Sequence, residues 1–141
     1  MAAAAKTAGE HVLGLSAGPE GVVLFAATNI DVNSNIDFSV VGPCDAVEVV
    51  VVSGTAKTGT PSVVFTLQGF NPASGLFEDL VAATALTDIG NKFLLVGAQV
   101  AVTANVSAQR AVRERLRLKI AYTGTPVTDV LNNVTACAFI S

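Results

Sequence analysis

The sequence predicts an all-β fold, an antiparallel β-sandwich or a jelly-roll-like barrel with an extended N-terminal arm. Three observations lead to this prediction. Valine and threonine supply 35 of the 141 residues, and β-branched side chains pack well on a pleated sheet but lose rotamer freedom in a helix. Apolar and polar residues alternate in several short segments, as they do in half-buried strands. Segments of this kind recur about every 8–15 residues with no amphipathic helix between them.

The predicted strands follow one another along the chain and are separated by turn residues. The clearest alternation lies at Arg115–Tyr122, where apolar residues share one face and mainly basic residues the other. Asn71–Gly75 is typical of a hairpin turn, because proline restricts φ and glycine tolerates a positive φ. Ser107–Glu114 is able to form a helical turn. We expect strands at Val22–Thr28, Ile36–Val41, Ala46–Ser53, Val63–Gln68, Leu76–Leu80, Lys92–Val96, Arg115–Tyr122 and Val134–Ile140.

The length of the chain favours one domain. We assign residues 1–10 to a flexible or extended arm and residues 11–141 to a single β domain. The start of the chain lacks the order of a signal peptide, and no apolar stretch approaches the ~20 residues that cross a bilayer. We therefore expect synthesis in the cytoplasm and no membrane partner. There, Cys44 and Cys137 would be reduced thiols packed as small hydrophobic residues, with a disulfide as the alternative.

The residue types that catalysis needs are scarce. His11 is the sole histidine and lies beside the arm, so a serine or cysteine nucleophile has no positioned base. Cysteine and histidine lack the spacing of metal ligands, and the adjacent Glu78 and Asp79 would face opposite sides of a strand. Gly54–Thr60 lacks the spacing of a phosphate-binding loop. We expect no enzyme activity, no cofactor and no metal.

Charge is sparse and unevenly placed. Charged residues make up 13% of the chain, against about 25% in typical proteins. Residues 1–105 carry a balance of −6 and residues 106–141 of +3, which gives the net charge of −3. This asymmetry predicts two differently charged surfaces. The net charge disfavours nucleic acid as a partner.

Three basic residues, which we call the basic stripe, stand out at Arg115, Arg117 and Lys119. On a strand they share one face, about 6.5–7 Å apart. The sequence shows no aromatic residue on that face for base stacking. Three interpretations stand: a solvated face, contact with an acidic protein partner, or contact with nucleic acid.

A chain with so few charges also needs a means of staying soluble. Either small polar residues cover its surface, or apolar surface is hidden in an oligomer. The run Val49–Val52 suits an ordinary core strand or a subunit contact, which makes Val50 and Val52 candidate contacts. The other candidate partner contacts are the basic stripe and Ala2, Ala3, Ala4, Ala5 and Lys6 of the arm.

One part of the chain resembles a known family. Val64–Leu80 is a strand ending in glycine, an Asn-Pro-x-Ser-Gly turn and an aromatic-containing return strand, and Ile89–Gly97 continues to a strand that ends in Val-Gly. This order resembles small structural proteins of tailed bacteriophages. In that family a basic and apolar strand and a final apolar strand follow, matched here by Arg115–Tyr122 and Val134–Ile140. The chain departs from the pattern at Phe70, where the family more often places a polar residue.

The resemblance implies a virion component, foremost a head decoration (cement) protein. Such proteins sit on the outside of the capsid, commonly as trimers, and reinforce the shell. The resemblance thus implies a homotrimer, the major capsid protein as partner, and a place on the virion surface after synthesis in the host cytoplasm. Two alternatives remain open. One is another virion part, such as a tail tube, head–tail connector or fibre-like protein. The other is a carbohydrate-binding β-sandwich module, which Tyr122, predicted to face the core, supports poorly.

Overall fold

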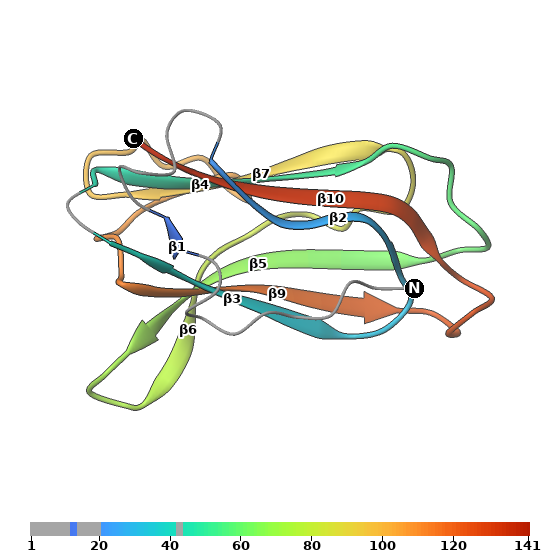
Figure 1. The fold of residues 1–141 in the computed structure, drawn as a ribbon, viewed down its shortest axis with the longest axis horizontal. Helices are drawn as coiled ribbons and strands as arrows, with labels where there is room; N and C mark the ends of the chain where they lie inside the picture. The colour runs from blue at the N-terminus through green and yellow to red at the C-terminus, as the bar shows by residue number, and fades with distance from the viewer. Residues whose placement is uncertain (1–11, 14–20, 42–43) are drawn as a thin grey trace.

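The computed structural model describes residues 12–13, 21–41 and 44–141, and within them the chain is all β (Figure 1). Ten strands in the described residues form two sheets that pack face to face, which confirms the predicted β-sandwich. The strands are β1 (Val12–Leu13), β2 (Val22–Ile30), β3 (Ser34–Val40), β4 (Ala46–Ser53), β5 (Ser62–Asn71), β6 (Leu76–Ala82), β7 (Gly90–Gly97), β8 (Ser107–Gln109), β9 (Arg115–Thr123) and β10 (Leu131–Ile140).

The order of the strands is that of a jelly roll. We call β1-β3-β9-β5-β6 sheet A and β2-β10-β4-β7-β8 sheet B. The eight long strands form four antiparallel pairs, which together make one long two-stranded ribbon: β2 with β10, β3 with β9, β4 with β7 and β5 with β6. Rolling this ribbon places β10 beside β4 and β9 beside β5. The result is the double-sheet, eight-stranded arrangement of a jelly roll.

Two short strands add parallel pairs that local patterns did not predict. β1 runs parallel to β3, and β8 runs parallel to β7. Because Ser107–Gln109 forms β8, the helical turn predicted at Ser107–Glu114 is wrong. The backbone here bonds to β7, since the Leu95 amide donates to the Val106 carbonyl oxygen (2.8 Å) and the Arg110 amide donates to the Gly97 carbonyl oxygen (3.1 Å).

The core lies between the inward faces of the two sheets. Phe38 of β3 and Phe65 of β5 are the largest side chains with no solvent exposure. Burying a side chain of this size stabilises the fold by about 1.5–3 kcal/mol. Alternation explains which side chains are buried, because every second residue of a strand points inward. The inward residues that pack with them include Val47, Val49, Val51, Leu67, Leu94, Leu116, Leu118 and Leu131.

The β5–β6 hairpin extends beyond the body of the sandwich (Figure 1). Its turn confirms the prediction at Asn71–Gly75. The Asn71 carbonyl oxygen accepts a hydrogen bond from the Gly75 amide (2.8 Å), and the Asn71 side chain accepts one from the Ala73 amide (2.9 Å). Gly75 has a φ of +73°, a conformation that favours glycine.

Candidate functional site

β9 places the basic stripe on the outer face of sheet A. Arg117 stands opposite Asp37 of β3, and its guanidinium donates two hydrogen bonds to that carboxylate, at 2.5 and 3.1 Å. These bonds raise the pKa of Arg117 above its ordinary value. Neither Arg115 nor Lys119 forms an ion pair with any residue that the structure describes. The stripe therefore contains one neutralised cation and two with no anionic partner among the described residues.

Two aromatic rings lie beneath the stripe, so the expectation that this face lacks aromatic residues is wrong. Phe70 and Phe77 are register partners on β5 and β6, with ring centroids 5.3 Å apart. The guanidinium of Arg115 lies 4.2 Å from the centroid of Phe70, and that of Arg117 lies 3.9 Å from the centroid of Phe77. Sequence reasoning missed them because only the pairing of β5 with both β6 and β9 brings these rings to the stripe.

The two adjacent acids of β6 have different surroundings. Glu78 accepts a hydrogen bond from Arg113 at 2.7 Å and lies 3.8 Å from Arg110. The hydrogen bond from Arg113 is the main cause that lowers the pKa of Glu78. Asp79 pairs in register with Gln68, and its carboxylate accepts a hydrogen bond from the side-chain amide of Gln68 at 2.7 Å. We call the outward residues Asp37, Asp79, Arg115, Arg117 and Lys119 the charged face.

Two shallow hollows meet at Lys119 on the charged face. The first encloses about 330 Å³ and is lined by Asn35, Gln68, Leu76, Phe77, Arg117 and Lys119. The second encloses about 380 Å³ and extends from Asn35 and Lys119 toward Asn33 and Ala121. Asn35 and Lys119 are exposed register partners on β3 and β9, and they line both hollows. We call the two hollows together the Lys119 groove.

The outer face of sheet B is apolar. Strands β2, β10, β4 and β7 contain only two charged residues, Glu48 and Lys92. Lys92 pairs with the buried Val51 and therefore lies on the inward side of β7. One row of outward register partners crosses all four strands, and Val52 lies beside it. We call these residues the apolar face: Val23, Val50, Val52, Phe93 and Cys137.

The predicted contact residues thus fall on two opposite faces of the sandwich. The run Val49–Val52 divides between the two sides of sheet B. Val49 and Val51 are fully buried, whereas Val50 and Val52 point outward, and Val52 is 41% exposed. The basic stripe lies on the other sheet. The candidate arm contacts Ala2, Ala3, Ala4, Ala5 and Lys6 lie outside the described residues, as does His11.

Both cysteines are free thiols and are not joined in a disulfide. Cys44 packs against the hydrophobic core. Burial, together with the neighbouring charge of Asp45, raises the pKa of the Cys44 thiol. Cys137 stands in the apolar face, between Val23 and Val50 in register. Cys44 thus packs as the small hydrophobic residue that the sequence predicted, whereas Cys137 occupies an outer surface.

Asp129 organises the loops at one end of the sandwich. Its carboxylate accepts hydrogen bonds from the amides of Thr60 (2.9 Å) and Thr125 (2.8 Å). Its carbonyl oxygen accepts one from the hydroxyl of Tyr122 (2.6 Å). These two amide hydrogen bonds lower the pKa of Asp129, and the one from Thr60 has the larger effect.

Asp129→Asn is expected to flatten the acid dependence of stability. A carboxyl with a lowered folded-state pKa contributes stability above its unfolded pKa, and that contribution is lost as the pH falls through the folded pKa. The free energy of unfolding should therefore decrease as the pH drops below about 4, and it should decrease less in the variant. Urea unfolding over this range measures the slope. Asp45→Asn is the control, because the Asp45 carboxylate accepts no hydrogen bond from the described residues. Equal slopes in wild type and Asp129→Asn would contradict the prediction.

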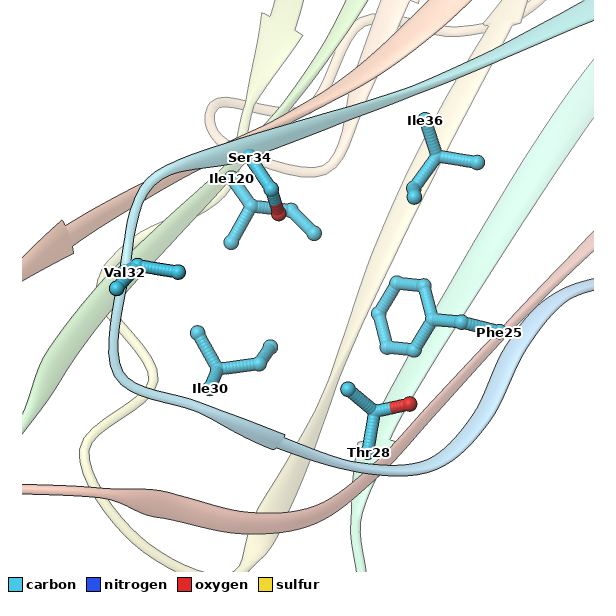
Figure 2. A pocket seen from close by; sticks show the side chains of 7 residues that line it. All are labelled: Phe25, Thr28, Ile30, Val32, Ser34, Ile36 and Ile120. Atoms are coloured by element: carbon cyan, nitrogen blue, oxygen red, sulfur yellow. The ribbon is translucent and has the colours of Figure 1, made fainter. Parts of the chain in front are cut away.

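Figure 2 shows a small cavity between the sheets beneath the β2–β3 turn. Its lining is mostly apolar and includes Phe25, Ile36 and Ile120. Its volume of about 10 Å³ offers room for roughly one water and none for a ligand. Over the described ranges, we find no group of three or more potential metal-ligating side chains. No helix there is long and apolar enough to cross a membrane.

These features define a class of protein, a jelly-roll β-sandwich with one apolar and one charged outer face. A comparison of the chain with protein-family models, curated proteins and solved structures finds no match.

Proposed function

We propose that this protein is a non-enzymatic decoration (cement) protein of a bacteriophage, which binds the outer surface of the head as an oligomer and stabilises the shell. The contrast between the apolar face and the charged face carries this proposal. A subunit that contacts both copies of itself and a different protein needs two chemically distinct surfaces. The resemblance of Val64–Leu80 to phage structural proteins supports the same conclusion. The jelly roll occurs in viral capsid domains but also in lectins, so the fold adds little.

The apolar face is the proposed contact between copies of the chain. Exposed apolar surface of this kind marks interaction sites, and Phe93, at the β7 end of the row, is 42% exposed. A face with so little charge can approach a neighbouring copy without repulsion. The charged face offers two cations, Arg115 and Lys119, that form no ion pair with a described residue and can pair with acidic groups of a different protein. We therefore assign the charged face to the major capsid protein and the apolar face to a homotrimer.

Stabilisation of the shell follows from where such a protein binds. A protein that binds the assembled lattice but not the separated subunits shifts the equilibrium toward the lattice by mass action. Joining three copies makes the second and third attachments intramolecular, so weak individual contacts add up to firm attachment. This mechanism needs no catalytic group, and it places the working protein on the virion after synthesis in the host cytoplasm.

Phage heads without this protein are expected to release their DNA at a temperature several degrees lower than complete heads. The measurement uses heads from the phage that encodes the chain, with and without its gene, heated in the presence of a DNA-binding dye. Adding purified protein to the deficient heads should restore the wild-type temperature, and gold labelling should find the protein on the head. Heads of unchanged stability with label on the tail would reject the proposal in favour of a tail component. Binding of glycans on an array, with no label on the particle, would favour the carbohydrate-binding alternative.

A further inference from the structure

We propose that the Lys119 groove binds an extended acidic segment of a partner protein. In this arrangement a carboxylate of the segment accepts hydrogen bonds from Lys119 and Asn35, and a neighbouring apolar side chain of the segment packs against Leu76 and Phe77. The inference extends the proposed function, because it names the chemistry of the partner that the charged face recognises.

The donors for the carboxylate are available. Lys119 and Asn35 are exposed and make no side-chain hydrogen bond or ion pair with a described residue. As register partners on antiparallel strands, they have Cβ atoms about 4.5–5.5 Å apart, so one carboxylate can reach both side chains. The ammonium group offers three donors, and the amide NH₂ group offers two. Arg117, in contrast, already directs two donors to Asp37.

The apolar contact lies at the hairpin end of the groove. Leu76 is 66% exposed, and it stands at the start of β6, on the hairpin that projects from the body (Figure 1). Phe77 is half-buried and is held in place by the ring of Phe70 on one side and the guanidinium of Arg117 on another. The groove therefore joins an apolar end to a cationic centre, and an acidic segment with one apolar side chain matches that order.

A protein carboxylate fits this groove better than a nucleic acid does. Base stacking needs an open aromatic face, but the guanidinium groups of Arg115 and Arg117 lie over the rings of Phe70 and Phe77. A phosphate backbone also carries a negative charge at every nucleotide. Some of these charges would lie close to the Asp79 carboxylate and be repelled by it. A peptide can place a single carboxylate at Lys119 and leave Asp79 uncontacted.

The test is fluorescence polarisation with a labelled eight-residue peptide of alternating glutamate and leucine, and a second peptide with glutamine in place of glutamate. We expect the glutamate peptide to bind the wild-type protein, and the glutamine peptide to bind at least tenfold more weakly. Lys119→Gln should weaken binding of the glutamate peptide at least tenfold. Lys57→Gln is the matched control, because it removes the same charge from an exposed loop outside the groove, and it should change nothing. Leu76→Ser should weaken binding of both peptides.

Three results would overturn the inference. The first is no binding of the glutamate peptide at millimolar concentration. The second is equal loss of binding in Lys119→Gln and Lys57→Gln. The third is tighter binding of a labelled oligothymidine than of the peptide, lost in Lys119→Gln, which would assign the groove to nucleic acid. Because the peptide assay contains no capsid, peptide binding together with failure of the head-stability experiment would reject only the decoration function.

Discussion

Replacing Val52 and Phe93 with glutamate is expected to dissociate the proposed oligomer into monomers. Both side chains belong to the apolar face, and each substitution would bring an unpaired carboxylate into the proposed contact between copies. Burying such a charge costs several kcal/mol even after the surroundings relax, so association should weaken by at least about 100-fold. Light scattering measures the effect directly. The wild type should have a multiple of the 14.3 kDa chain mass, with a trimer expected, and the variant should have the chain mass itself.

The matched control is the double variant Ile89→Glu and Val102→Glu. It adds the same charge at two apolar residues that are 60% and 69% exposed and lie in connections outside the apolar face. This control should keep the wild-type mass, and circular dichroism should show the same β content in all three proteins. A monomeric wild type would contradict self-association through this face. A hexamer or open polymer would favour a tail component.

Phe38→Ala is expected to cause a large loss of stability. Phe38 has no solvent exposure and lies in the centre of the core, so removing its ring forfeits burial and leaves a cavity. Substitutions of this kind cost about 3–5 kcal/mol, which is a large part of the 5–15 kcal/mol that stabilises a typical domain. Equilibrium unfolding in guanidinium chloride, followed by circular dichroism, gives the difference in the free energy of unfolding.

Phe77→Ala is the control for this prediction, since it removes the same ring from the outer face of the same sheet. Phe77 is half-buried and contacts Arg117, Arg115 and Phe70, so we expect a loss of about 1 kcal/mol, from partial burial and these ring contacts. Equal losses in the two variants would show that the inward face of β3 does not form the core. The comparison separates burial between the sheets from contacts on the charged face.

The three residues of the basic stripe have different surroundings, which affects how the charged face should be studied. Arg117 is tied to Asp37 and lies over an aromatic ring. Arg115 lies over the same aromatic pair without an ion pair. Reversing the charge of either arginine would disturb contacts within the protein as well as contacts with a partner. Lys119 makes no such contact with the described residues, so its substitution reports on the partner alone.

Local patterns were enough to predict the all-β sandwich and most of its strands. Alternation of apolar and polar residues is a property of each strand by itself, and it identifies which residues point inward, as at Leu116 and Leu118. The hairpin at Asn71–Gly75 was predictable for a similar reason, because the turn depends on residues that are adjacent in the chain. The basic stripe was found in the same way, from the alternation within β9.

The composition of the two outer faces did not follow from any local pattern. The apolar face combines residues from β2, β4, β7 and β10, and Phe70 and Phe77 reach the basic stripe through the pairing of β5 with β6 and β9. β8 forms at Ser107–Gln109, where a helical turn was predicted, because this segment pairs with the backbone of β7. Register between distant strands depends on how the whole ribbon rolls and packs. For this reason the chain shows which side of each strand is apolar, and only the folded protein shows which sides meet.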